Sequence, residues 1–300
     1  MKDYIISFFK EFDFPQEARE ELLTNFDIIW KNDDARGVFE TYIKEYNITD
    51  KLDWGKSTDD IVEAGKTLGI HEYSSHLIFL ICLTKHAKEL YEQKGYSYEM
   101  YRATFDDIRC KLFECQKMHS IWGNELLGIW YGRFFELNLF ALGRFQFEKR
   151  EFYNPAGEDY KRGSKCIKRG DMVINIHIPS NGRPVTKELI DDAFARGYEF
   201  YKDLFPDGVV PFSLRSWLLY ERQREFLPEN SNILTLMDYF DIYFSHDDEK
   251  FLDWWRIFGK NYNNNIDEMP TDTSLQRAYV DWVKKGNFPG HGHGILLYKK

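Results

Sequence analysis

Long apolar runs and processing signals are missing from the sequence. No stretch of about 18 consecutive apolar residues occurs, because Lys85 and His86 soon close the most apolar segment, residues 76–83. The chain begins Met-Lys-Asp-Tyr, with charged or polar residues every few positions, which is typical of neither a secretory signal nor a transit peptide. We therefore expect a soluble protein that does not interact with membranes.

Cysteine and clustered positive charge are also scarce. The four cysteines form no Cys-x-x-Cys pair and are too sparse for a disulfide scaffold, so we expect reduced thiols in a cytoplasmic protein. The formal net charge is -9, and the one short basic stretch, residues 161–169, is typical of a solvated loop. Nucleic acid is not expected as a partner, because contacts to phosphates need clustered Lys and Arg.

Aromatic residues, by contrast, are abundant. The 300 residues include 25 Phe and 19 Tyr, and 43% of the chain is hydrophobic. Disordered chains lack the apolar surface that offsets chain entropy, so this composition predicts a well-packed protein. The length leaves room for two cores, since domains typically run about 100–200 residues.

Residues 1–132 show helical periodicity and predict an all-helical N-terminal domain. Apolar residues recur every three or four positions in several segments, namely 5–12, 18–29, 73–87 and 101–113. The sequence Ser-Thr-Asp-Asp at 57–60 is typical of an N-cap that opens a helix closed by Gly69.

The periodicity changes in residues 133–300, which we expect to form a second, mixed α/β domain. Polar and apolar residues alternate in residues 142–149 and 173–178, and this pattern predicts half-buried strands. Further strand candidates are residues 210–219, 254–258 and 295–298.

Helices are predicted between these strands, and together they define the fold class. One helix follows Thr186, a second runs from Ser231 to Phe244, and a third begins at the capping box of Thr273 and Gln276. The order of elements predicts a mixed β-sheet with packed helices, and an α+β protein overall.

Two groups of polar residues on the predicted strands are candidates for chemistry. His177 lies near the end of a strand, before a turn that contains Gly182 and leads into a helix, where ligands and phosphates commonly bind. Arg144, Gln146 and Glu148 form a polar stripe that could line a cleft, with Glu148 as a general base. The alternatives are a histidine hydrogen-bonded inside the sheet and a solvated face of an edge strand.

Two weaker candidates have structural alternatives. His291 and His293 place two imidazoles on one strand face, as in a metal site, but they lack a nearby third ligand, and the surrounding glycines indicate flexibility or close packing as readily. Tyr239 and Tyr243 lie one turn apart on a predicted helix. Either could act as a general acid that protonates a thiolate, and the alternative is that both are core residues. Known nucleotide-binding, kinase and serine-hydrolase motifs are absent from the sequence.

Several segments together resemble a bacterial family of acyltransferases that join a helical N-acyltransferase-type domain to a GNAT-like C-terminal domain. The matching segments occur in order along the C-terminal part: residues 142–148, 174–179, 216–219, 231–233, 275–278 and 292–295. The resemblance covers the helical part more weakly.

The resemblance implies acyl transfer from acetyl-CoA or another acyl-CoA to an amine, without a metal. In the GNAT fold, a splayed central pair of strands admits the pantetheine, and amides at the start of the following helix hold the pyrophosphate. Carried onto this sequence, the strands are residues 173–178 and 210–219, and the cofactor-binding residues are Ile178, Ser180, Asn181, Gly182 and Arg183. The usual Gln/Arg-x-x-Gly-x-Gly/Ala signature is absent, which implies weaker or different binding of coenzyme A.

The resulting hypothesis is an N-acyltransferase that acts on a small-molecule amine or a peptide. Glu148 or His177 would accept the amine proton, backbone N–H groups would polarise the thioester carbonyl, and Tyr239 would protonate the thiolate. The substrate-binding candidates are Arg144, Gln146, Arg215 and Trp217. The helical domain would cover the acceptor side and set specificity.

Two rival hypotheses belong to other classes of protein. One is a GNAT-derived module that has lost catalysis and binds a small ligand or a protein, which the missing signature favours. The other is a metal-dependent hydrolase that uses His291 and His293.

Overall fold

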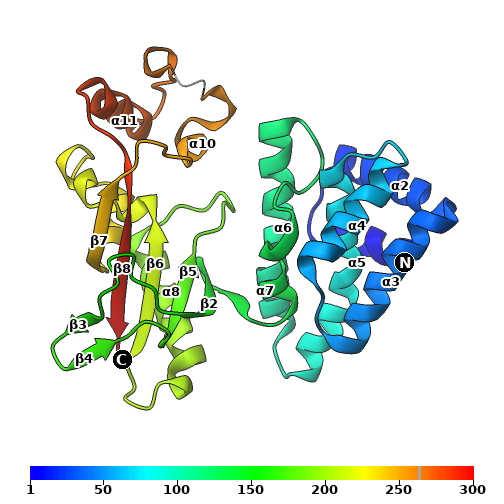
Figure 1. Cartoon of the computed structure of the whole chain (residues 1–300), viewed down its shortest axis with the longest axis horizontal. Coiled ribbons are helices and arrows are strands. Elements are labelled where there is room, and N and C mark those ends of the chain that lie inside the picture. The colour runs from blue at the N-terminus through cyan, green and yellow to red at the C-terminus, as the bar shows by residue number, and fades with distance from the viewer. Residues whose placement is uncertain (263–264) are drawn as a thin grey trace. The chain divides into compact units, whose positions relative to one another are not determined.

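The computed structural model describes residues 1–262 and 265–300, and the chain divides into two compact units (Figure 1). The first unit comprises residues 1–141 together with residues 179–181, and the second comprises residues 142–178 and 182–300. Helices make up the first unit, and a sheet with packed helices makes up the second.

The helical unit is built around one almost entirely buried helix. Its longer helices are α1 (Lys2–Glu11), α2 (Gln16–Lys31), α3 (Asp33–Thr49), α4 (Trp54–Lys66), α5 (Glu72–Gln93) and α6 (Tyr98–His119), and the short α7 (Gly132–Phe135) follows. Residues 74–84 of α5 are all buried, because the side chains on every side of this helix are apolar or small, with His76 as the exception. The predicted helical character is confirmed, but α4 begins earlier than expected: Asp53 caps it, and Ser57 lies buried inside it.

The chain forms a six-stranded mixed sheet in the order β1-β2-β5-β6-β8-β7, of which β2, β5, β6, β7 and β8 belong to the second unit. Its strands are β1 (Leu139–Leu142), β2 (Phe145–Glu151), β5 (Met172–His177), β6 (Val210–Ser216), β7 (Asp241–Asp247) and β8 (Gly290–Tyr298). Strand β5 runs parallel to β6, whereas β2–β5, β6–β8 and β7–β8 are antiparallel. The basic stretch around residue 161 is not a plain loop, since it forms a small hairpin of β3 (Tyr160–Arg162) and β4 (Lys165–Ile167).

Helix α8 (Lys187–Tyr201) covers the apolar face of this sheet. Phe194 on α8 packs against Phe145 and Phe212, with ring centroids 5.6 and 5.2 Å apart. Gly197 lets the helix approach closely, because a Cβ there would lie 2.8 Å from the ring of Phe147. Side chains alternate along a strand, so the opposite face carries the polar residues of β2, β5 and β6.

The elements between β6 and β8 depart from the sequence prediction. Residues 254–258 form helix α10 (Trp254–Phe258) rather than a strand, because Trp254, Ile257 and Phe258 then pack together against Tyr279 of α11 (Ser274–Lys284). The helix predicted from Ser231 to Phe244 ends early, as α9 (Asn232–Met237), and β7 follows. The capping box at the start of α11 is confirmed.

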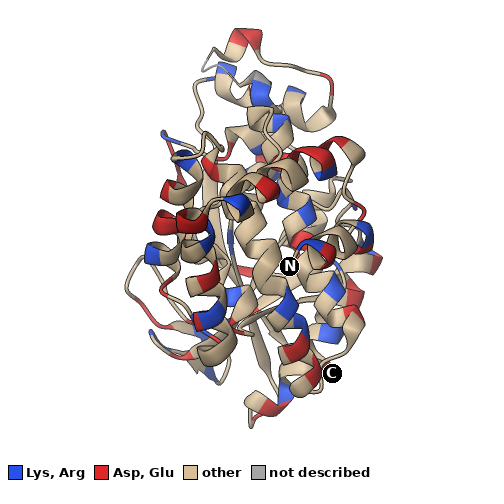
Figure 2. Ribbon diagram, turned by 90° about the vertical axis from the view of Figure 1, so that its right-hand side faces the viewer, with Lys and Arg blue, Asp and Glu red and all other residues tan. Residues whose placement is uncertain are grey.

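Charged residues of both signs alternate along the ribbons of the chain. Figure 2 shows Lys and Arg interspersed with Asp and Glu on the helices, which accords with many ion pairs one helical turn apart, such as Lys187–Asp191 and Arg196–Asp192. Within the described residues, no helix combines the length and the apolar character needed to cross a membrane.

Candidate active site

Strands β5 and β6 separate soon after they pair. In the part of the chain that the structure describes, their ladder has two residue pairs, Ile174–Phe212 and Asn175–Ser213. The antiparallel ladders on either side, β2–β5 and β6–β8, are much longer. Beyond Asn175 and Ser213, β5 and β6 no longer pair with each other, although β5 stays paired with β2 and β6 with β8. The gap between these two strands is therefore the place where a ligand could enter the sheet.

The structure brings the two predicted proton acceptors together at this opening. His177 Nε2 lies 2.7 Å from Glu148 Oε2, because the register of β2 and β5 places Glu148 and His177 on adjacent positions of the polar face. Glu148 is buried, and the His177 side chain is 20% exposed. A buried carboxylate that is hydrogen-bonded to an imidazole fixes the orientation of the ring.

Two further polar residues extend this pair across the sheet. Asn175 Nδ2 lies 3.1 Å from His177 Nε2, and Ser213 Oγ donates to Asn175 Oδ1 at 3.4 Å. The imidazole nitrogen can donate to Glu148 or accept from Asn175, depending on its protonation. A polar row thus runs from β2 through β5 to β6.

A pocket opens on the same polar face next to this row. It has a volume of about 390 Å3 when the open space at its mouth is included. Its polar lining comes from five strands and includes Arg150, Asn175, Ser213, Arg215, Tyr243 and His293. Asn175 and Ser213 connect the pocket to His177.

The pocket environment keeps His293 neutral. Burial, and then the positive charges of Arg215 and the other cationic side chains nearby, lower the pKa of His293 to about 4. Its side chain is only 4% exposed, and the structure gives its ring no hydrogen bond among the described residues. An uncharged imidazole therefore faces the pocket at neutral pH.

The loop after β5 holds the residues predicted to bind coenzyme A. Gly182 has a φ of +75°, which glycine adopts without strain, and Ser180, Gly182 and Arg183 are exposed. Arg144 is buried, and its Nε donates to the carbonyl oxygen of Pro184 at 3.1 Å. Arg144 thus anchors the segment that leads into α8.

Two predicted site residues lie away from Glu148 and His177. Tyr239 is not on a helix: it precedes β7, its hydroxyl donates to Asp191 Oδ1 at 2.5 Å, and its ring packs on Phe194 on the α8 side of the sheet. Trp217 lies in the 3-10 turn Trp217–Leu219 and packs against the hydrophobic cluster around Tyr279. Neither side chain lines the pocket.

Gln146 and Arg215 lie on the polar face, but in different settings. Gln146 is 1% exposed and stands opposite His177 in the strand register. Arg215 is exposed at the pocket. Sequence analysis did not propose Asn175, Ser213 or Arg150 as site residues, although the alternation of β5 and β6 marks the first two as polar-face residues. Tyr243 was a candidate general acid, but on a predicted helix rather than on β7.

His291 does not take part in a metal cluster. Its Nε2 lies 2.9 Å from Asp253 Oδ2 and its Nδ1 lies 3.3 Å from Asp248 Oδ2, so both ring nitrogens face carboxylates. Among the described residues, no group of three or more potential metal-ligating side chains is arranged to hold an ion.

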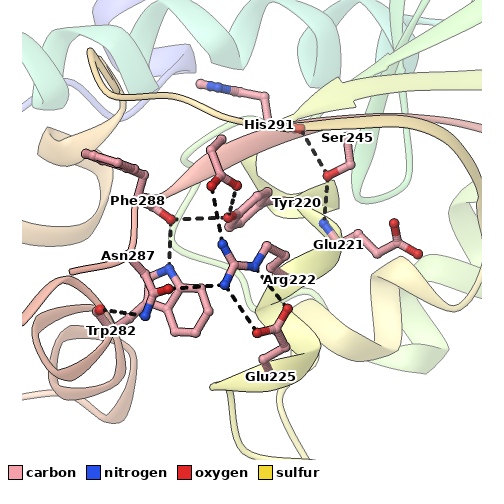
Figure 3. A network of polar contacts seen from close by, with 10 residues as sticks. Tyr220, Glu221, Arg222, Glu225, Ser245, Trp282, Asn287, Phe288 and His291 are labelled. Carbon is pink, nitrogen blue, oxygen red and sulfur yellow. Dashed lines mark hydrogen bonds and ion pairs between the residues drawn. The ribbon is translucent and has the colours of Figure 1, made fainter. Parts of the chain in front are cut away.

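A polar network ties the ends of β7 and β8 to the segment after β6 (Figure 3). Tyr220 donates to Asp247 Oδ1 at 2.5 Å, and Arg222 contacts Asp247 Oδ2 at 3.2 Å and Asn287 Oδ1 at 3.1 Å. The guanidinium of Arg222 also lies 4.6 Å from the ring centroid of Trp282. These groups satisfy one another, so we interpret the network as structural.

Comparison with protein families agrees with this architecture. Residues 139–296, more than half of the chain, match the family described as "GNAT-like C-terminal domain". The chain belongs to this GNAT-like family. Residues 3–137 match the "N-acyltransferase N-terminal domain", so the predicted resemblance to a two-domain acyltransferase architecture is confirmed.

Solved acyltransferase structures have the same fold as this GNAT-like chain. An acyltransferase mutant in complex with octanoyl-CoA superposes with a TM-score of 0.72 at 18% identity, covering 98% of this chain and 88% of the other. An acyltransferase in complex with decanoyl-CoA and teicoplanin gives a TM-score of 0.70 at 18% identity, covering 97% and 86%. No curated protein matches the sequence significantly.

Proposed function

We propose that this GNAT-like protein is an N-acyltransferase that moves an acyl group from an acyl-CoA to an amine. The observation that carries the proposal is the hydrogen-bonded Glu148–His177 pair, which lies where β5 and β6 separate. The similar structures are of acyltransferases holding octanoyl-CoA or decanoyl-CoA, so a medium-chain acyl-CoA is the donor to test first.

In this proposal, the donor enters the opening between β5 and β6. The pantetheine would extend between β5 and β6 beyond Asn175 and Ser213, where the two strands no longer pair with each other, and N–H groups there would polarise the thioester carbonyl. Ile178, Ser180, Asn181, Gly182 and Arg183 would hold the phosphates, with Arg144 fixing the end of their loop through Pro184.

The Glu148–His177 pair would accept the proton of the attacking amine. When the amine nitrogen bonds to the thioester carbon, the carbon–sulfur bond breaks and coenzyme A leaves as the thiolate. The amine proton passes to His177, and Glu148 stabilises the resulting imidazolium at 2.7 Å. Tyr239 receives no part in this scheme, because its hydroxyl is bonded to Asp191 on the other side of the sheet.

A cytoplasmic location is part of the proposal. All four cysteines are free, including the exposed Cys166. Free thiols and an acyl-CoA donor are both typical of a reducing compartment.

Donor binding is tested by the thermal stability of the protein with acetyl-, octanoyl- and decanoyl-CoA. A ligand at about 100 times its dissociation constant stabilises the folded state by about 2.7 kcal/mol, which is visible as a higher unfolding midpoint. We expect a rise that differs with acyl length. If none of the three donors raises the midpoint, the proposed function is wrong.

Catalysis is tested by release of coenzyme A from the bound donor in the presence of a panel of amines that includes an aminoglycopeptide. We expect His177→Ala to lower kcat by about 10²- to 10⁴-fold, the usual contribution of a general base. Glu148→Gln should have a smaller effect, since it acts through His177. His246→Asn, which changes an exposed histidine of β7, is the control and should retain activity.

Two outcomes separate this mechanism from its rival. Full activity in the Glu148→Gln, His177→Ala double variant would exclude the pair as the base. A donor that binds without transfer to any amine of the panel would favour the inactive binding module.

A further inference from the structure

The pocket beside the catalytic pair combines two cationic side chains with a buried neutral imidazole. Arg150 and Arg215 are exposed at its rim, on β2 and β6, and His293 lies inside it on β8. We propose that this pocket binds a carboxylate of the acceptor, so that the substrates are amines that also carry a carboxylate. This inference rests on the proposed function.

Arg150 and Arg215 are available for an anionic ligand. Neither guanidinium has an ion pair among the described residues, whereas other exposed arginines, such as Arg196 and Arg224, are paired with carboxylates. The pocket lining contains one carboxylate, that of Glu151, against the two guanidinium groups. Arginine presents parallel N–H donors that match the two oxygens of a carboxylate.

His293 adds a second, independent indication of a ligand. Only 4% of its surface is exposed, and it lines the pocket. Its ring has no hydrogen-bond partner among the described residues. A buried polar group normally has a partner, since leaving it unpaired costs free energy. A neutral imidazole N–H can donate to a carboxylate oxygen, and the lowered pKa of His293 is consistent with surrounding positive charge.

The position of the pocket assigns it to the acceptor rather than to the donor. Asn175 and Ser213 line the pocket, and Asn175 also contacts His177, so an acceptor held there would have its amine near the proposed base. The loop proposed for the donor phosphates follows the opposite, carboxyl end of β5, whereas the pocket includes Val173 near the start of that strand. Aromatic side chains, Phe152 and Tyr243, complete the walls.

The test is calorimetric titration of the full-length protein, without donor, with phenylalanine and with phenylalanine amide. The two ligands differ only in the carboxylate, which the amide lacks. Both carry a phenyl ring that can pack against the aromatic walls of the pocket. We expect phenylalanine to bind at least about tenfold more tightly than the amide, as expected for a charge-assisted contact. Arg215→Gln and Arg150→Gln should each remove most of that difference. Arg196→Gln, on the α8 side of the sheet, is the control and should leave it unchanged.

A titration with coenzyme A in the same variants distinguishes the two sources of anionic groups. Unchanged coenzyme A affinity in Arg215→Gln supports an acceptor pocket, whereas an equal loss of coenzyme A affinity would assign the arginines to the donor phosphates and overturn the inference. Equal or undetectable binding of phenylalanine and its amide would also overturn it. These outcomes leave the acyl-CoA result untouched, so the inference and the proposed function can fail separately.

Discussion

His76 is a buried histidine that the fold keeps uncharged. It lies on α5 with 1% exposure, and its Nδ1 has no hydrogen-bond partner among the residues that the structure describes. Burial lowers the pKa of His76 to about 4. Between about pH 6.5 and 4, the unfolded chain therefore binds a proton at this residue that the folded protein does not.

Because of this difference, we expect His76 to make the folded protein less stable as the pH is lowered. The free energy of unfolding should decrease from pH 7 toward pH 4, by about 3 kcal/mol from this residue when its pKa shift is fully expressed. The measurement is urea unfolding at pH 7.5 and at pH 4.5. In His76→Leu, which has no titrating group at this position, the loss of unfolding free energy between the two pH values should be smaller by about that amount. His71→Asn removes an exposed histidine but keeps a capping side chain for α5, so it should behave as wild type. An equal loss in all three proteins would contradict the argument.

At the candidate site, the sequence identified residues but could not place them side by side. Glu148 and His177 were each predicted as polar-face residues, because alternation along their own strands is a local signal. That they touch depends on the register between β2 and β5, which pairs Glu148 with Asn175. Registers between distant segments are set by long-range packing, so neither the pair nor the pocket around His293 was predictable from spacing.

At the scale of elements, the glycines at the start of β8 are packing residues. A Cβ at Gly292 would lie 1.8 Å from the carbonyl oxygen of Leu219, and one at Gly290 would lie 2.1 Å from that of His246. Of the alternatives considered for this segment, close packing is the one that the structure supports, since other parts of the chain approach the backbone directly.

Two glycine substitutions should therefore have opposite effects. Gly292→Ala should destabilise the protein by more than about 3 kcal/mol or prevent folding, because the methyl group meets backbone that cannot move aside easily. Gly37→Ala, at an exposed position inside α3 with nothing within 4 Å, should stabilise it by about 0.5–1 kcal/mol. Soluble expression and chemical unfolding measure both; a neutral Gly292→Ala would disprove the packing argument.

Short elements between β6 and β8 show where local patterns mislead. Residues 254–258 are uniformly aromatic or apolar apart from Arg256, so their pattern cannot separate a strand from a helix of this length. For β7, the spacing of Tyr239 and Tyr243 suggested a helical turn, but pairing with β8 decides the conformation. By contrast, the capping box of α11 is a purely local signal and was predicted correctly.

At the scale of the whole molecule, the last residues of the N-terminal family match, 133–137, pack with the helices before them. Phe135 of α7 stacks on Trp54 with centroids 5.4 Å apart, and its carbonyl oxygen accepts from Tyr46 Oη at 2.8 Å. Trp54 Nε1 donates to Glu136 at 2.7 Å. We therefore propose that the helical domain extends to about residue 138, beyond the boundary at 132 predicted from sequence.

Two fragments test this boundary. A fragment of residues 1–138 should unfold cooperatively, whereas one of residues 1–132 loses Phe134 and Phe135, each of which is fully buried. Removing a buried Phe costs about 3–5 kcal/mol, so the shorter fragment should be far less stable in thermal unfolding followed by circular dichroism. The full-length Phe135→Ala variant provides a comparison without truncation. Equal stability of the two fragments would refute the longer boundary.

The position of β8 has a consequence for synthesis of the chain. This strand comes after all other strands in sequence, yet it lies between β6 and β7 in the sheet (Figure 1). During synthesis on a ribosome, β6 therefore keeps one unpaired edge and β7 lacks its partner strand until β8 emerges. The helical unit can form much earlier. The nascent protein therefore passes through a stage in which the helical unit is folded and the sheet is incomplete and prone to associate with other chains. Chaperone binding would matter most at this stage.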